Sequence, residues 1–217
     1  MVAGNPYRRT FNASNFAETA ITIMCINGGN CGEHAGFPTC PCDQFRSQVY
    51  FPSCWNGKDL DTPDHQSHVA YPAIGNYNFG VCPQSHPVAL FSLFYEFYFE
   101  TGVYGDDITH FAFANGDPTG YGYHGDFIMG WTNRDLLQTA HADCITSSDC
   151  PTLINQPANP QTLIYPAPNE NVGLSAPISS LPGNNSIDWN WAAQWWASRG
   201  VHSNPPANSI SFKPNNK

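Results

Sequence analysis

Two short stretches of the sequence concentrate the residue types that carry out acid–base and metal chemistry. The first covers residues 51–68 and the second covers residues 116–127. Together they hold three histidines and five aspartates, in a chain in which only 12% of the residues are charged. A stable fold does not need imidazole, carboxylate and glycine so densely mixed, so we interpret both stretches as parts of a functional site.

In the first stretch, His65 and His68 are three residues apart. Thr62 or Asp61 can cap a short helical turn that has Pro63 at its first position. Such a turn places residues three apart on one face, so both imidazoles could reach one substrate or ion. The structural alternative is that these side chains cap the loop and bond to backbone groups.

In the second stretch, glycines on either side of His124 permit the close approach of another backbone or of a ligand. In an extended conformation His124 and Asp126 point to the same side, whereas Tyr121 and Tyr123 point to the other. A histidine beside a carboxylate can act as a general base, a proton donor or a metal ligand. The structural alternative is a glycine-rich turn around a buried histidine.

Metal binding is a second chemistry that these side chains could support. A divalent metal ion could be bound by three imidazoles, which suit zinc or copper: His65, His68 and His124. Calcium could be bound by clustered carboxylates, although the spacing and distal glutamate of an EF-hand are absent: Asp59, Asp61 and Asp64.

The aromatic segment 88–101 is the best candidate for a β-strand. Its even-numbered residues, Glu96 and Tyr98 among them, would share a face open to water or ligand, and the odd-numbered aromatic residues would face the core. Glu96 and Glu100 would lie about 13–14 Å apart on a regular strand, too far for the carboxyl pair of a glycosidase, which needs roughly 5–9.5 Å. The pairing of one of them with Asp126 across the sheet stays open.

Short segments broken by 19 prolines and 18 glycines predict a mainly β fold. We expect an antiparallel β-sandwich of the jelly-roll type, with long Pro/Gly/Asn loops, one or two short helices and disulfide staples. Further strands are expected at residues 19–25, 46–51, 69–71, 109–114 and 126–130, and helices at residues 133–144 and 188–199. We expect a core domain over residues 1–150, with residues 151–217 as loops and a tryptophan-rich short helix packed on it.

The eight cysteines favour up to four disulfides in an oxidising compartment. Two bridges are expected from the spacing, Cys144–Cys150 and Cys54–Cys82. Zinc is the alternative for the cysteines near the start of the chain, although they form no paired C-x-x-C motifs: Cys25, Cys31, Cys40 and Cys42.

The net charge of −9 argues against binding to nucleic acid or to an anionic membrane. No apolar run approaches the ~20 residues that span a bilayer. Asn-x-Ser sequons at Asn12 and Asn184 agree with secretion and N-glycans. Residues 1–6 lack the charged start and apolar run of a signal peptide, so either the signal was removed or Met1 is an internal residue of a longer chain.

Several uncommon sequence motifs occur in the same order as in a fungal secreted family of uncharacterised domains, DUF1996, and the chain resembles that family. They are MVAGNP (1–6), FPSCW (51–55), LDTPDHQSHVAYP (60–72), CPQSHPV (82–88), GDPTG (116–120), HGDFIMGW (124–131) and LQTAH (137–141). The resemblance, over about residues 1–144, implies secretion and the same two stretches as the site. It also implies a preceding half with a His-Val-His element, which has no match here. Members often accompany cell-wall-binding modules, which favours polysaccharide as the ligand.

We therefore expect a secreted, monomeric carbohydrate-active enzyme that hydrolyses a fungal or plant cell-wall polysaccharide. His124 and Asp126 would handle protons, while His65 and His68 would position substrate, water or a metal ion. Substrate would be bound by aromatic and acidic side chains, namely Asp64, Glu96, Tyr98, Tyr123, Trp55 and Trp131. The alternatives are a non-catalytic wall-binding module and a histidine-based metal-binding protein.

Overall fold

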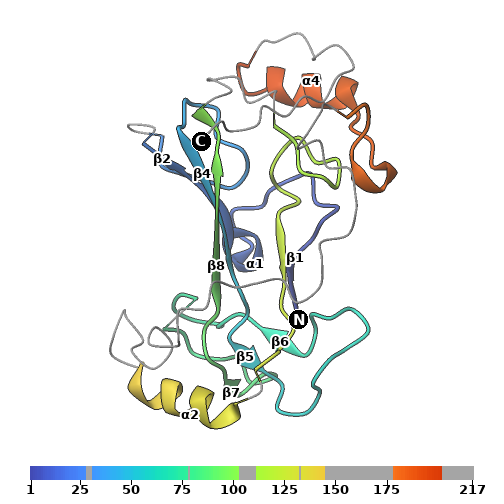
Figure 1. Ribbon diagram of the computed structural model, residues 1–217. Helices are drawn as coiled ribbons and strands as arrows, with labels where there is room; N and C mark the ends of the chain where they lie inside the picture. Colours follow the sequence, from blue (N-terminus) through green and yellow to red (C-terminus); the bar gives the residue numbers. More distant parts are fainter. Residues whose placement is uncertain (28–30, 78, 103–110, 132, 145–177, 202–217) are drawn as a thin grey trace. The chain divides into compact units, whose positions relative to one another are not determined.

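The computed structural model describes the chain except for residues 28–30, 78, 103–110, 132, 145–177 and 202–217. The described residues form mainly β structure with a few short helices (Figure 1). They belong to two compact units, one made of Met1–Asp126 with Asn171–Lys217 and the other of Phe127–Glu170. The domain limits expected from the sequence, 1–150 and 151–217, stay a prediction.

The helices and strands follow one another along the chain in a β-rich order. They are β1 (Val2–Gly4), α1 (Phe16–Thr19), β2 (Ile21–Ile26), β3 (Glu33–His34), β4 (Gln44–Tyr50), β5 (Cys54–Trp55), β6 (Val69–Ala70), β7 (Val88–Ala89), β8 (Phe94–Glu100), β9 (His124–Asp126), α2 (Arg134–Asp143), η3 (Pro182–Asn184) and α4 (Trp189–Ala197).

The largest sheet has four antiparallel strands in the order β3-β2-β4-β8. Its strands alternate between buried apolar and more polar residues, so that Ile21 and Ile23 of β2 are almost fully buried on one face. On the other face the register aligns Thr22, Gln48 and Glu96 in one row across three strands. The sheet therefore has one apolar face and one polar face.

A two-stranded sheet of β1 and β9 packs against the apolar face. A Cβ atom added to Gly125 would lie 2.7 Å from Cζ of Phe51 and 3.2 Å from Cγ1 of Val49. A Cβ atom on Gly4, whose φ is +90°, would lie 2.6 Å from Cδ1 of Ile21. The two layers approach so closely because both glycines lack side chains.

A third sheet, in the order β6-β5-β7, is fastened by the Cys54–Cys82 disulfide. Cys54 is fully buried. The N–H of Asn56, just after β5, donates to the carbonyl of His68, just before β6, at 3.0 Å. This sheet therefore closes the loop that holds the first of the two chemistry-bearing stretches.

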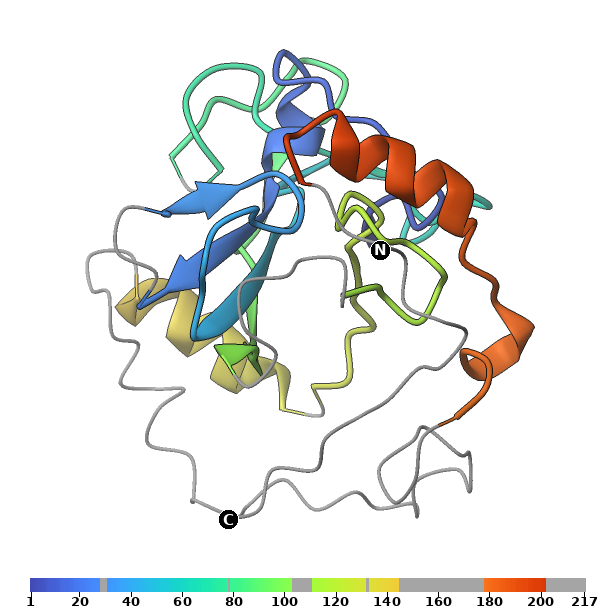
Figure 2. The ribbon, with the colours of Figure 1, turned by 90° about the horizontal axis from the view of Figure 1, so that it is seen from above.

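The helix α4 packs against the loop that precedes β9, as Figure 2 shows from above. Asp188 caps the helix by accepting the N–H of Trp191 at 2.9 Å. The guanidinium group of Arg199 lies 4.4 Å from the ring centroid of Trp195 and donates a hydrogen bond to the hydroxyl of Tyr121. None of the helices in the described part of the chain combines the length and apolar character that a membrane-spanning helix needs.

The mainly β fold with antiparallel sheets, few short helices and disulfides is confirmed, whereas the jelly-roll order stays a prediction. Both expected helices are confirmed, as α2 and α4. The Cys54–Cys82 bridge is also confirmed. Cys150, the partner expected for Cys144, lies outside the described residues.

The single strand expected at residues 88–101 is wrong, because β7 and β8 belong to different sheets. Pro52 separates their partners, β5 and β4, and has no N–H to continue a ladder. Phe97 and Phe99 are 51% and 46% exposed instead of buried, since β8 is an edge strand.

Two other expected strands differ from the structure. The strand expected at 126–130 is wrong, because β9 ends at Asp126, and the second compact unit begins at Phe127. Of the strand expected at 109–114, residues 109 and 110 lie outside the described part, and residues 111–114 are not in a strand.

The contact of β9 with the sheet predicts that Gly125→Ala destabilises the protein. The added methyl group would collide with the buried ring of Phe51, which should lower the free energy of unfolding by about 1–3 kcal/mol. Urea denaturation measures the change. Gly130→Ala is the control, because a Cβ atom there meets nothing within 4 Å. Equal effects of the two substitutions would contradict the close packing.

Candidate functional site

The turn that follows Leu60 is organised around the carboxylate of Asp64. Oδ1 of Asp64 accepts hydrogen bonds from the N–H of Ser67 at 3.0 Å, the hydroxyl of Thr62 at 2.7 Å and the N–H of Gln66 at 3.1 Å. The N–H of Ser67, with these other donors, holds the pKa of Asp64 well below its usual range. Asp64, expected to bind substrate, therefore shapes the turn.

His65 has a left-handed backbone, with φ of 55°. Its Nδ1 lies 2.8 Å and 2.9 Å from the two carboxylate oxygens of Asp61, and this hydrogen bond lowers the pKa of Asp61. The imidazole is 58% exposed. Strained backbone at a non-glycine residue is concentrated at functional sites, which makes this exposed imidazole–carboxylate pair a candidate for function.

The structure separates His68 from His65. His68 is only 4% exposed, and its Nδ1 lies 3.0 Å from the hydroxyl of Thr62. A single turn forms around Pro63, where the carbonyl of Thr62 accepts the N–H of His65 at 2.8 Å. It does not continue as a helix to His68, since the left-handed backbone of His65 interrupts it. His68 therefore belongs to the interior of the turn, whereas His65 faces water.

His124 and Asp126 lie on the same side of β9, as the alternation along a strand predicts. Nε2 of His124 is 3.9 Å from Oδ2 of Asp126, and these side chains are 30% and 66% exposed. Nδ1 of His124 lies 2.9 Å from the carbonyl of Gly122. A carbonyl can only accept, so Nδ1 carries a proton and Nε2 is the atom that can exchange one.

The two stretches contact β1 on its two opposite edges. On one edge the N–H of Val2 donates to the carbonyl of His65 at 2.7 Å, and Nε2 of Gln66 donates to the carbonyl of Gly4 at 3.1 Å. On the other edge Val2 pairs with Asp126. Two strand spacings, about 10 Å, thus separate the backbones of His65 and Asp126.

The histidines do not gather around a shared carboxylate, because each exposed imidazole has its own acidic partner. Within the described residues, the groups of His, Cys, Asp and Glu side chains close enough to share a metal ion do not include His65, His68 or His124. The geometry thus offers two acid–base pairs rather than a three-histidine metal site.

The polar face of the four-stranded sheet carries a second candidate site. Glu33 accepts hydrogen bonds through Oε1 from Nε2 of Gln48, at 2.6 Å, and from the hydroxyl of Thr22. Oε1 of Gln48 accepts from Nε of Arg46 at 2.9 Å, and that Nε lies 3.2 Å from Oε1 of Glu96. A continuous polar series therefore links carboxylates from the two edge strands.

Aromatic rings adjoin this series. Tyr98 pairs with Arg46 in the register and is 52% exposed. Tyr50 stacks on Phe94 at 4.0 Å and on Tyr77 at 4.8 Å. Burial raises the pKa of Tyr50, and the carboxylates of the two glutamates raise it further, which places its hydroxyl within their field. We call the following set the polar sheet face: Thr22, Glu33, Arg46, Gln48, Tyr50, Phe94, Glu96 and Tyr98.

Three further residues were predicted to bind substrate: Trp55, Tyr123 and Trp131. Trp55 is half-buried and donates from Nε1 to the carbonyl of Asp59 at 2.6 Å. Tyr123 stacks on Phe113, and burial raises its pKa to about 12. Trp131, 41% exposed, belongs to the second compact unit.

The structure thus divides the predicted site between two surfaces. The pair His124–Asp126 lies on the ribbon that packs on the apolar face of the sheet, while Glu96 and Tyr98 lie on the opposite face. Glu33 was not predicted from the sequence. The residues between the two glutamates were not predicted either, although the polar side chains at every second position, Gln44, Arg46 and Gln48, are a signal for one polar face of a strand.

Comparison with known proteins yields a family but no characterised relative. A protein-family model described as a domain of unknown function, DUF1996, matches residues 1–131. This range includes the polar sheet face and both acid–base pairs. No curated protein and no solved structure matches the chain.

The bonds to Asp64 predict a pH-dependent effect of Asp64→Asn. The folded protein holds the pKa of Asp64 below its ordinary value of about 3.9. The carboxylate therefore contributes its full stability above that pH, and the contribution is lost as the pH falls toward the folded pKa. The substitution should lower the urea midpoint at neutral pH, and the difference from wild type should shrink below about pH 4.

Urea midpoints measured across the acid range test this expectation. Asp43→Asn, at an exposed position outside the turn, is the matched control. A deficit for Asp64→Asn that stays constant down to the lowest pH would contradict the stabilisation of the ionised carboxylate.

Proposed function

The chain belongs to the DUF1996 family, whose description names no function, and we propose that it is a secreted protein that binds cell-wall polysaccharide on the polar sheet face. The observation that carries the proposal is the series of hydrogen-bonded side chains from Glu33 through Gln48 and Arg46 to Glu96, beside the exposed ring of Tyr98.

The chemistry of this face suits a sugar. Carboxylate, amide and guanidinium groups offer fixed acceptors and donors for hydroxyl groups, and an exposed aromatic ring can pack against the C–H face of a pyranose. The protein bonds of Glu33 and Glu96 engage Oε1 of each, so Oε2 can accept from a ligand. These side chains are already held in place, which reduces the entropy lost on binding.

Binding fits this face better than catalysis does. A glycosidase needs one carboxyl group that is protonated and donates to the leaving oxygen. Glu33 faces the amide of Gln48 and the hydroxyl of Thr22, and Glu96 faces the cation of Arg46. These surroundings suit two anions rather than an acid and a base.

Secretion is supported by the disulfides and by one sequon. Three bridges lie in the described residues, and such bridges persist in oxidising compartments. Asn12 is exposed in an Asn-x-Ser sequon, where an N-glycan would not clash with the core. The negative charge of the chain favours a neutral polymer over nucleic acid.

Tyr98→Ala should weaken binding to insoluble cell-wall glucan by about tenfold or more, because it removes the exposed ring. Glu96→Gln should weaken it through loss of the anionic acceptor. Depletion of the protein from solution by increasing amounts of washed wall material measures both. Tyr7→Ala is the matched control, since Tyr7 is 86% exposed and outside this face. Equal retention of the Tyr98 and Tyr7 variants would exclude the face as the binding site.

A second candidate function, hydrolysis of the polysaccharide, is favoured by the two acid–base pairs that flank β1. Nε2 of His124 faces Asp126, and Nδ1 of His65 is held by Asp61, which leaves its Nε2 free. One imidazole would take a proton from water as its oxygen attacks the anomeric carbon. The other, as imidazolium, would protonate the leaving oxygen as the C–O bond breaks.

For this candidate, His124→Asn should reduce the release of soluble sugar from wall glucan by about 100-fold or more without lowering the thermal midpoint. His86→Gln is the control, because the contacts of His86 are with the hydroxyl of Ser85 and the carbonyl of Ser67. Reducing-sugar assays on the same wall material measure release. Product formation that survives in the His124 variant, or no product from wild type, would eliminate hydrolysis at this site.

A further inference from the structure

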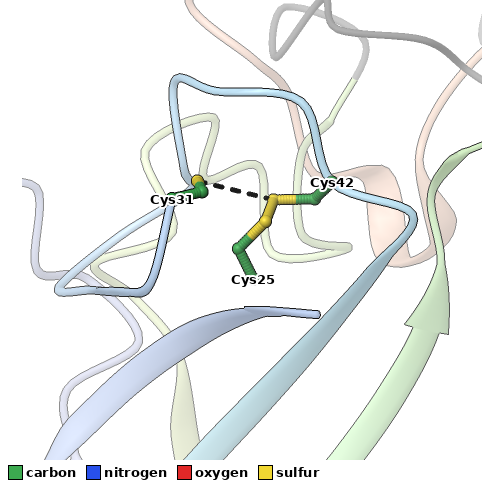
Figure 3. A group of neighbouring side chains, drawn as sticks. All are labelled: Cys25, Cys31 and Cys42. Atoms are coloured by element: carbon green, nitrogen blue, oxygen red, sulfur yellow. Dashed lines mark hydrogen bonds between the residues drawn. A yellow bond between two sulfur atoms is a disulfide. The ribbon is translucent and has the colours of Figure 1, made fainter. Parts of the chain in front are cut away.

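Two disulfides near the start of the chain lie in direct contact. One joins Cys25 to Cys42 and the other joins Cys31 to Cys40. Sγ of Cys31 is 3.7 Å from Sγ of Cys42, the contact drawn in Figure 3. The sulfur atoms of Cys25, Cys31 and Cys42 all lie within 4.8 Å of one another. These three sulfur atoms therefore form one group, and the sulfur atom of Cys40 joins it through the bridge to Cys31.

The sheet brings these cysteines together because three strands begin or end beside them. Cys25 lies near the end of β2, and Cys31 precedes β3, which pairs back on β2. The N–H of Cys25 donates to the carbonyl of Gly32 at 2.9 Å. Cys40 and Cys42 lie just before β4. The positions of the sulfur atoms are thus fixed by backbone pairing as well as by the bridges.

The sulfur–sulfur contact between the two bridges has the spacing of a tetrahedral zinc site. A Zn–S distance of about 2.3 Å gives sulfur–sulfur edges of about 3.8 Å in a tetrahedron. The 3.7 Å between Sγ of Cys31 and Sγ of Cys42 is close to such an edge. After reduction, the sulfur atoms of each bridge would need to move apart by about 2 Å to reach the same spacing, which side-chain rotation can supply.

We propose that Cys25, Cys31, Cys40 and Cys42 form a four-thiolate site for Zn²⁺ in the reduced protein, and that the two bridges are the oxidised state of the same site. Reduction of each bridge takes two electrons and two protons from a dithiol, which becomes a disulfide. Zn²⁺ then displaces the four thiol protons. Oxidation by a disulfide such as oxidised glutathione reverses the step and releases the ion.

His34 is close enough to Cys31 and Cys40 to share an ion with them, but its hydrogen bond to a backbone carbonyl assigns it a supporting role in the site. Its Nε2 lies 2.8 Å from the carbonyl of Cys31, which can only accept, so Nε2 carries a proton. The same atom lies 3.4 Å from Sγ of Cys31 and 3.7 Å from Sγ of Cys40. An N–H donor so close to sulfur offsets the excess negative charge of four thiolates around a divalent ion, as partners behind metal ligands commonly do.

One side of the sulfur cluster is buried in the protein, and the other side is partly exposed to solvent. Cys25 and Cys42 are buried, and Phe37 and Phe45 pack in the same core cluster. Cys31 and Cys40 are half-buried, so reductant and ion can reach the outer bridge first. This site is independent of the proposed polysaccharide binding, which uses the polar sheet face.

The Cys54–Cys82 bridge provides the internal control. It ties Cys54 of the three-stranded sheet to Cys82, whose Sγ lies 4.0 Å from the carbonyl of Ser53. A bridge of this kind supplies two sulfur atoms, whereas a structural zinc site uses four ligands. Removal of Cys54 and Cys82 should therefore leave metal binding intact.

The test uses the full chain, reduced under anaerobic conditions with a phosphine that becomes its oxide, and titrated with Co²⁺. We expect one ion per chain, with the visible bands of tetrahedral cobalt and thiolate charge-transfer bands, and displacement by one equivalent of Zn²⁺. Zn²⁺ should protect four thiols from alkylation.

The double variant Cys31→Ser with Cys40→Ser should lose metal binding, while Cys54→Ser with Cys82→Ser should retain it. His34→Gln should keep the stoichiometry and weaken affinity about 10–100-fold.

Metal binding can still be tested if reduction of the disulfides unfolds the chain. If the reduced chain unfolds without metal, Zn²⁺ should restore the native circular dichroism, because metal binding then supplies folding free energy. Absence of tetrahedral cobalt bands, protection of no thiols, or equal loss of binding in both double variants would overturn the proposal.

Discussion

The close contact between the β1–β9 ribbon and the apolar face of the four-stranded sheet is the constraint on which the rest depends. It requires glycine at Gly4 and Gly125, where any side chain would collide with the sheet. The ribbon covers the part of that face around Ile21 and Val49, whereas Phe97 and Phe99 on the edge strand stay about half exposed. The same ribbon fixes β1, whose two edges then hold the His65 turn and the His124 strand.

This layering separates the face proposed to bind polysaccharide from the two histidine–carboxylate pairs. The glutamates and Tyr98 lie on one side of the sheet, and the acid–base pairs lie with the ribbon on the other. A single polymer chain bound on the polar sheet face would therefore not reach His124 directly. The sulfur cluster occupies a third place, at the end of the sheet where β2, β3 and β4 meet. One small β scaffold thus holds three chemically different surfaces.

Local signals made parts of this structure predictable. Asn133 and Asp188 mark the two longer helices because each caps the first turn with its side chain. By contrast, Glu33 and Glu96 are 63 residues apart and are linked only through the register of four strands. The periodicity of residue types along one strand does not show which residues of neighbouring strands pair with one another. The left-handed backbone of His65 could not be predicted from the sequence either, since it depends on the hydrogen bonds that Asp64 accepts around it.

The contact of Arg199 with Trp195 and Tyr121 has a consequence for how the molecule opens. Tyr121 lies within the family-matched range, whereas α4 lies beyond it. We expect a helix and a loop joined in this way to lose the protection of their amide hydrogens together. Fraying of α4 would expose the ring of Tyr121, which is only 5% accessible in the folded chain, and would release contacts that hold the loop leading into β9.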